Sequence, residues 1–330
     1  MNNTNKMIDI IIPVYNTPSD LLERCLTSAI RQTYRDVKVI VIDDGSTAKN
    51  TIAVLEKYCK IGSLELYVQQ NNGVSTARNL GLSKSRGDYV LFLDSDDYID
   101  EDYLERIASI AISKNKDLVF SGRVNDINKK NDAPFYNHQI SLVDDSRVIA
   151  FKSHAFTCSA VLIKGELARS IEFTATTTMG EDTEYIIKAL SLGNGFFEGG
   201  GGNYYVQNLE SITHNNSISS IERYLDESVK LGDCLSNYLR LTDDEVTMFL
   251  YLKCARAHQK LAQDMHFRKV RKVLKNHIIK YGLPRLSFFK IVKTPHLAKG
   301  EKIRIYLFGC RNYLIIYLLD KTRALIKRRS

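Results

Sequence analysis

The first 125 residues alternate between two hydrophobic patterns, one typical of buried strands and one typical of amphipathic helices. Runs of β-branched and other apolar residues predict strands at 9–15, 37–44, 64–69, 89–94 and 118–124. Between them, apolar residues at helical spacing predict helices at 19–32, 48–60, 75–85 and 100–113. Strands that alternate with helices predict an α/β fold, with a Rossmann-like, mostly parallel open sheet and right-handed crossovers.

This alternation weakens after residue 125, and the pattern becomes purely helical near residue 217. In the middle of the chain we expect a strand at 157–164 and a helix at 181–191. Four consecutive glycines, Gly199 to Gly202, predict a turn, because no G-K-[ST] ending follows them. Amphipathic stretches then predict long helices at 218–239 and 244–265. We therefore expect an α/β domain over 1–216 and a helical region over 217–330.

Charge divides the chain in nearly the same way. Residues 1–250 hold 25 Lys+Arg against 35 Asp+Glu, whereas residues 251–330 hold 21 against 3. A basic C-terminal region of this kind predicts an anionic partner, either membrane phosphates or nucleic acid. No zinc-finger or RNA-binding signature is visible, so a nucleic-acid partner is not expected.

The apolar segment 303–319 suggests which anionic partner to expect. It contains Arg304 and Arg311 and is at the short limit for crossing a bilayer. Together with the basic residues that follow it, the segment predicts a helix lying on an anionic membrane surface. A helix that closes the core, with a solvated basic end, is the alternative.

The cysteines and the N-terminus indicate a compartment. The six cysteines lie far apart, without a C-x-x-C pair or a zinc-like cluster, so neither disulfides nor a zinc site are expected. The first residues lack a basic segment followed by an apolar run, so no signal peptide is expected. We expect a cytoplasmic protein, peripheral on the inner face of the membrane.

Acidic and aromatic residues gather where the predicted strands end. The carboxyl ends of parallel strands meet at one edge of a sheet, so we expect Tyr15, Asp43, Asp44 and the acids of 94–97 to line one crevice. Close carboxylates raise one another's pKa unless a cation or hydrogen-bond donors keep them ionised. A divalent ion, Mg²⁺ or Mn²⁺, bridging these carboxylates to a diphosphate would meet that need.

Other interpretations of the acidic cluster explain it less well. An EF-hand loop starting at Asp94 would place Ile99 where the turn requires glycine. A phosphatase that forms an aspartyl phosphate would need a lysine and a second acidic motif, and no convincing ones follow. Acids that merely cap the helix at 100–113 would account for Asp100 and Glu101, but poorly for the three acids before them.

Four motifs, in this order and spacing, resemble those of family-2 glycosyltransferases with the GT-A fold, particularly bacterial polysaccharide-building members. They are IIPVYN (11–16), VIVIDDGST (39–47), GVSTARNLGLSKSRGDYVLFLDSDDYI (73–99) and GEDTEY (180–185). The resemblance covers about residues 7–215. It implies an inverting hexosyltransferase with a site for a UDP-sugar donor and a divalent metal.

The resemblance also implies roles for individual residues. Asp182 matches the catalytic base, and His214 lies where it could complete the metal shell. An exposed aspartate at a helix N-terminus stays ionised, and it suits a base if acceptor binding excludes water and raises its pKa. The residues matching the donor contacts are Pro13, Tyr15, Asp43, Asp44, Arg78, Asp94 and Ser95, and those matching the metal site are Asp96, Asp97 and His214.

The predicted reaction transfers the sugar to a hydroxyl of a growing polysaccharide or oligosaccharide, and we expect this acceptor to be lipid-linked. A metal-dependent nucleotidyltransferase is one alternative, although PVYNTPSD after the first strand lacks the Gly-rich, basic phosphate loop expected there. A basic nucleic-acid-binding protein with an α/β domain is the other.

Overall fold

The computed structural model describes residues 6–125, 158–175, 180–206, 217–284, 287, 291, 299–310 and 314–318. The chain divides into two compact units. Unit 1 contains the strands and the helices up to residue 192, and unit 2 contains the helices that begin at residue 218. The expected boundary between 216 and 217 stays a prediction.

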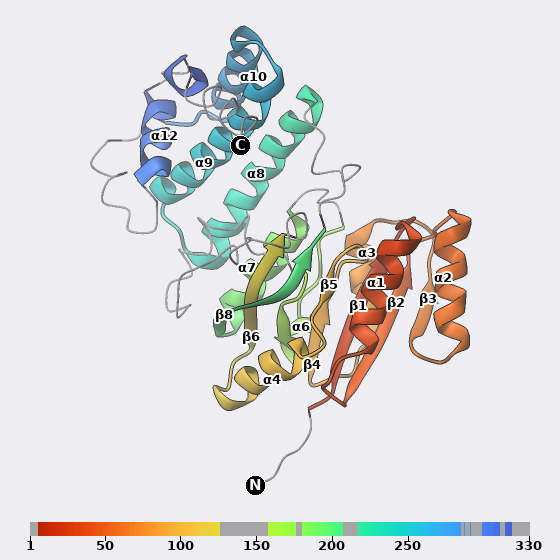
Figure 1. Ribbon diagram of the computed structural model, residues 1–330. Coiled ribbons are helices and arrows are strands. Elements are labelled where there is room, and N and C mark those ends of the chain that lie inside the picture. Colours follow the sequence, from red (N-terminus) through yellow and green to blue (C-terminus); the bar gives the residue numbers. More distant parts are fainter. Residues whose placement is uncertain are drawn as a thin grey trace. The chain divides into compact units, whose positions relative to one another are not determined.

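Unit 1 is built on an eight-stranded sheet of order β3-β2-β1-β4-β7-β6-β8-β5 (Figure 1). Strands β3, β2, β1 and β4 are parallel to one another, β6 and β8 are parallel, and β7 runs antiparallel between β4 and β6. The α/β class and the mostly parallel sheet are therefore confirmed. The strands are β1 Ile8–Val14, β2 Val37–Asp43, β3 Glu65–Val68, β4 Tyr89–Phe92, β5 Tyr98–Ile99, β6 Leu118–Asn125, β7 Leu162–Lys164 and β8 Gly195–Tyr205.

Helices cover both faces of this sheet. The side chains of α1 Ser19–Ile30, α2 Lys49–Lys60 and α4 Tyr103–Ser113 join one hydrophobic cluster with the strands. The opposite face contacts α3 Val74–Lys84, α6 Gly165–Arg169 and α7 Glu181–Leu192. Burial on both faces explains why β1 and β2 are mostly apolar, with Asp9 and Lys38 among the charged residues inside them.

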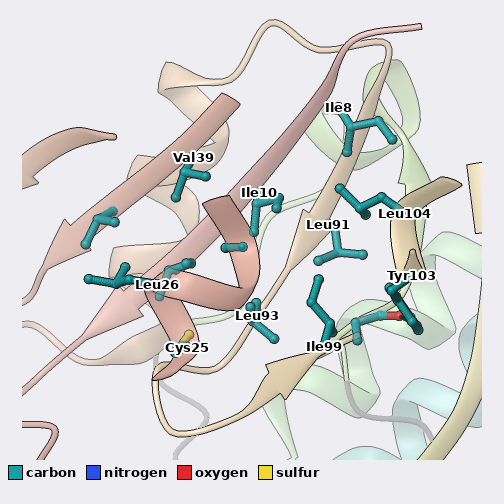
Figure 2. Packing of buried hydrophobic residues seen from close by; sticks show 14 of the residues in the cluster. Ile8, Ile10, Cys25, Leu26, Val39, Leu91, Leu93, Ile99, Tyr103 and Leu104 are labelled. Atoms are coloured by element: carbon teal, nitrogen blue, oxygen red, sulfur yellow. Dashed lines mark hydrogen bonds between the residues drawn. The ribbon is translucent and has the colours of Figure 1, made fainter. Parts of the chain in front are cut away.

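The hydrophobic core follows the two-residue period of the strands. Ile8, Ile10 and Ile12 of β1 join the cluster that also holds α1 and α4 residues, drawn in Figure 2. Ile11 points the other way and lies against Gly81 of α3, where a Cβ atom would overlap its side chain. Each such aliphatic side chain contributes about 1.5–3 kcal/mol when fully buried.

The prediction of a turn at Gly199 to Gly202 is wrong, because these glycines lie inside β8. β8 pairs with β6 on both sides of an irregularity between Ser121 and Arg123, where the register passes from Glu198 to Asn203. Side chains would not fit there: a Cβ on Gly200 would overlap the Glu198 carboxylate, and Gly202 has φ +97 and lies against Arg106. Glycine thus lets an irregular strand approach charged side chains closely.

Unit 2 consists of α8 Ile218–Leu239, α9 Asp243–Asp264, α10 Phe267–Lys280 and α12 Lys299–Gly309, with a helical stretch at 314–318. A capping box between Thr242 and Glu245 starts α9. Among the described residues, no helix is both long enough and apolar enough to span a bilayer. In the segment 303–319, Ile305, Phe308 and Ile316 are buried, while Leu314 and Leu318 are exposed.

Candidate active site

The ends of β1 and β2 form the first part of the site. Val14 pairs with Asp43 in the parallel register, so the residues after both strands lie at one edge of the sheet. Pro13 is buried within β1, and the Tyr15 side chain beyond it is 50% exposed. Asp43 is buried, and its carboxylate accepts a hydrogen bond from the Ser46 amide at 2.9 Å.

Asn16, which the motif analysis did not single out, joins these two strand ends. Its backbone has φ 49, and its side-chain oxygen accepts hydrogen bonds from the Thr47 and Ala48 amides at 2.8 and 2.9 Å. The backbone amide of Asn16 donates a hydrogen bond to the Ser46 hydroxyl at 2.9 Å. An asparagine two residues after a strand is the available sequence signal, because asparagine tolerates the left-handed region.

Asp44 organises the loop that leads into α3. Its carboxylate accepts hydrogen bonds from the Gln69 side chain at 2.7 Å and from the Asn72 and Gly73 amides at 2.9 Å each. Gly73 has φ +89, a conformation that side-chain-bearing residues rarely adopt. These contacts place the first turn of α3, and with it Arg78, below the strand ends.

Arg78 is a buried cation between two carboxylates from distant parts of the chain. One guanidinium nitrogen, Nη2, lies 2.8 Å from Oδ1 of Asp94, and Nη1 lies 3.1 Å from Oε1 of Glu181. The Arg78 side chain is only 5% exposed. A buried arginine that loses such partners leaves charges uncompensated, so this arrangement holds the acidic strand end and the start of α7 together.

Phe173 packs against Arg78 and is itself held by Asn79. The guanidinium lies 5.3 Å from the centre of the Phe173 ring, which stacks on Tyr185 at 3.9 Å. Asn79 both donates to the Phe173 carbonyl and accepts from the Phe173 amide, each at 2.9 Å. Asn79 directly follows Arg78 in the motif GVSTARN, but nothing in the sequence indicates its partner 94 residues away.

The four residues 94–97 differ from one another in their surroundings. Asp94 binds Arg78, and the Ser95 hydroxyl lies 2.7 Å from that of Thr17. Asp97 is buried, and its carboxylate accepts from the Val206 amide at 3.1 Å and from the Ser159 hydroxyl at 3.3 Å. Asp96 is partly exposed. The protein itself therefore places a cation beside Asp94 and hydrogen-bond donors beside Asp97.

The donor set at this edge fits a hard divalent ion only in part. Within the described ranges, no group of three or more His, Cys, Asp or Glu side chains is arranged to hold a metal. Asp96 offers a partly exposed carboxylate, while Asp97 is buried and hydrogen-bonded. His214 lies outside the described residues. A Mg²⁺ or Mn²⁺ ion would take one carboxylate here and complete its shell with ligand oxygens and water.

Asp182 lies in the first turn of α7, next to Glu181. Its Oδ1 accepts a hydrogen bond from the Thr183 amide at 2.7 Å. Burial, and then the charge of Glu181, raises the pKa of Asp182 to about 6, although Arg78 acts in the opposite direction. Acceptor binding was expected to raise this pKa, whereas the fold already raises it. A carboxylate with this pKa is ionised at neutral pH and is a better proton acceptor than an ordinary aspartate.

Comparison with known proteins gives a consistent assignment. Residues 9–170 match the model of glycosyl transferase family 2. Glycosyltransferase GlyA of Streptococcus pneumoniae is 38% identical over 112 residues, which are 34% of this chain and 16% of that protein. A glycosyltransferase of Haemophilus influenzae is 32% identical over 176 residues, which are 51% of this chain and 66% of that protein. The chain thus spans less than two thirds of the length of these relatives.

Two solved structures share the fold. The S. aureus TarS 1–349 complex with UDP-GlcNAc has a TM-score of 0.64 and 20% identity, with 93% of this chain and 91% of that chain covered. The mannosyltransferase PcManGT from Pyrobaculum calidifontis, in complex with GDP-Man and Mn²⁺, has a TM-score of 0.52 and 15% identity, with 96% and 87% covered. At these identities the likeness establishes a common fold.

Proposed function

Since the chain belongs to glycosyl transferase family 2, we propose that it is an inverting glycosyltransferase that moves a sugar from a UDP-sugar to an acceptor hydroxyl. The observation that carries this proposal is the position of Arg78. Through its ion pairs with Asp94 and Glu181, it joins the acidic strand end to the helix turn that bears Asp182. A donor-binding edge and a proton acceptor are thereby held in one unit.

The donor would bind at the strand ends. Tyr15 offers a half-exposed ring for the base, and the carboxylates of Asp43 and Asp44, with Pro13, would contact the nucleoside. Asp94 and Ser95 would meet the ribose. UDP as the nucleotide is supported by the UDP-GlcNAc complex of TarS, a protein of the same fold.

Arg78 would act mainly as a positioning residue. From its motif, Arg78 was predicted to contact the donor. Both of its Nη nitrogens instead bind protein carboxylates, and the side chain is 5% exposed. We therefore assign it the task of orienting Asp94 toward the donor and Glu181 beside Asp182.

A divalent ion, Mn²⁺ or Mg²⁺, would be held by Asp96, with Asp97 and His214 as the further predicted ligands. When bound, the ion stabilises the charge that develops on the departing diphosphate. Asp97 would first have to exchange its hydrogen bonds with Val206 and Ser159.

Asp182 would accept the proton of the acceptor hydroxyl. The hydroxyl oxygen attacks the anomeric carbon, the bond from that carbon to the diphosphate oxygen breaks, and its electron pair leaves with UDP. The proton moves to the Asp182 carboxylate. Because one displacement occurs and no enzyme–sugar bond forms, the anomeric configuration inverts.

The acceptor would be a growing polysaccharide or oligosaccharide on a lipid carrier. Support comes from the charge distribution: 21 Lys+Arg against 3 Asp+Glu in residues 251–330 would hold the enzyme at an anionic surface. The protein would then work at the cytoplasmic face of the membrane, where lipid carriers present their sugars.

A screen of UDP-sugars for metal-dependent hydrolysis or transfer tests this function. Asp96→Ala should abolish the metal-dependent part of UDP binding measured by calorimetry. Asp182→Asn should keep UDP binding and lower transfer by about 10²–10⁴-fold, the usual contribution of a general base. Equal loss of UDP binding in both variants would contradict the division of roles between the two aspartates.

A further inference from the structure

Helix α10 has one face made almost entirely of cations. Four of its apolar residues, Val270, Val273, Leu274 and Ile278, are buried within unit 2. The helix contains no acidic residue. We call the exposed cations of this helix the α10 basic face; they are Arg268, Lys269, Arg271, Lys272 and Lys275.

Within the described parts of the chain, no ion pair is found for any member of the α10 basic face. Lys280, at the end of the same helix, differs: its ammonium lies 2.9 Å from Asp226 of α8. The residues after α10 are an unsuitable source of partners as well, because positions 281–330 hold 12 Lys+Arg against only Glu301 and Asp320. Among the described residues, the charge of the α10 basic face is therefore not offset, and an anionic partner could supply the missing negative charge.

The cations occupy positions that destabilise the helix. Arg268, Lys269 and Arg271 lie in its first turn or directly after it, where the helix dipole disfavours positive charge. Arg268 and Lys272 are four residues apart, as are Arg271 and Lys275, and like charges at this spacing repel. A merely solvated helix would not require such an arrangement, whereas binding an anionic surface would offset it.

We propose that the α10 basic face docks unit 2 on an anionic phospholipid surface. This inference rests on the proposed function, in which the acceptor is carried by a lipid. The exposed side chain of Ile279 favours a lipid over a nucleic acid as the partner. Ile279 follows Lys275 by one helical turn, on the same face, and its side chain is 66% exposed. An apolar side chain among cations gains free energy by entering the headgroup region, whereas a phosphate backbone offers it nothing comparable.

The test is vesicle sedimentation of the full chain at low salt, with phosphatidylglycerol-containing or pure phosphatidylcholine vesicles. The wild type should bind only the anionic vesicles. The triple variant Arg268→Gln/Lys272→Gln/Lys275→Gln should bind them about 100-fold more weakly, since each cation near an anionic leaflet contributes about fivefold. Ile279→Asn should weaken binding without changing the net charge.

A matched control separates the α10 basic face from overall charge. Arg31→Gln/Arg35→Gln/Lys49→Gln removes three exposed cations of unit 1 and should change vesicle binding far less. Equal vesicle binding by the wild type and the α10 triple variant would overturn the proposal, as would tighter binding of the wild type to duplex RNA than to vesicles at equal phosphate concentration.

UDP calorimetry on the same proteins keeps this inference distinct from the proposed function. The α10 triple variant should bind UDP as the wild type does, because no donor-site residue is changed. A wild type that binds anionic vesicles but not UDP would contradict the sugar-transfer function alone. A wild type that binds UDP but no vesicles would contradict the docking surface alone.

Discussion

The two units of the chain use charge in opposite ways. In unit 1 the cation Arg78 is 5% exposed and is paired with Asp94 and Glu181. In unit 2 the cations of the α10 basic face are exposed and no described acid pairs with them. A buried, paired charge orients its neighbours at a fixed place, whereas exposed, unpaired charges act together on a large surface. The positive net charge of the chain therefore says little about the charges at its candidate active site.

Removing the buried cation Arg78 should have the largest effect on the stability of the protein. Arg78→Met leaves Asp94 and Glu181 without their partner, and we expect the free energy of unfolding to fall by about 3–5 kcal/mol. The exposed Arg35→Met should change it by less than about 0.5 kcal/mol. Urea unfolding followed by circular dichroism measures both. Similar values for the two variants would mean that the pairs around Arg78 contribute no more than surface contacts.

The pH dependence of transfer tests the charges around Asp182 without removing Arg78. Because the pKa of Asp182 is raised to about 6, kcat/KM should fall about tenfold per pH unit below that value as the base becomes protonated. Glu181→Gln removes a negative charge that raises this pKa, so the acidic limb should move to lower pH. An unshifted limb would indicate that Glu181 does not act on Asp182.

The thermal stability of the protein should also depend on the ionisation of Asp182. The folded state raises the pKa of Asp182, so it disfavours the ionised form relative to the unfolded chain, in which the pKa is near 4. Asp182→Asn should therefore raise Tm above pH 6, and this gain should disappear as the pH falls from 6 toward 4. A gain of the same size at every pH would point to a cause other than ionisation.

Strands with apolar side chains could be predicted from the sequence, whereas contacts between residues far apart in the chain could not. The parallel strands β1 and β2 were predicted well, because burial on both faces leaves mostly apolar runs. The strand β8 was missed, since its glycines carry no side chains that could show a two-residue period. The rule that ligands bind at strand ends brought Tyr15, Asp43 and Asp94 to one edge without identifying any contact.

The contacts at the site depend on tertiary structure. Glu181 is 103 residues from Arg78, and no spacing rule predicts that pair. Asp97 was predicted as a metal ligand because of its neighbours in sequence, yet its carboxylate binds the Val206 amide, 109 residues away. A carboxylate that holds two segments together and one that binds an ion look the same in sequence. The catalytic assignment of Asp182 was reached through a motif, whereas its raised pKa follows from burial beside Glu181.

Removing one exposed cation of the α10 basic face should have the smallest effect on stability. Lys272→Gln relieves repulsion with Arg268 and Lys275, so it should stabilise the protein by about 0.2–0.5 kcal/mol per relieved pair at low ionic strength. The gain should vanish near 1 M salt, where the Debye length is about 3 Å. Arg78→Met should lose stability at both salt concentrations, because buried pairs are screened much less. A Lys272→Gln variant that is destabilised at low salt would show that this lysine has a partner within the folded protein, and the α10 basic face would then lack one of its central cations.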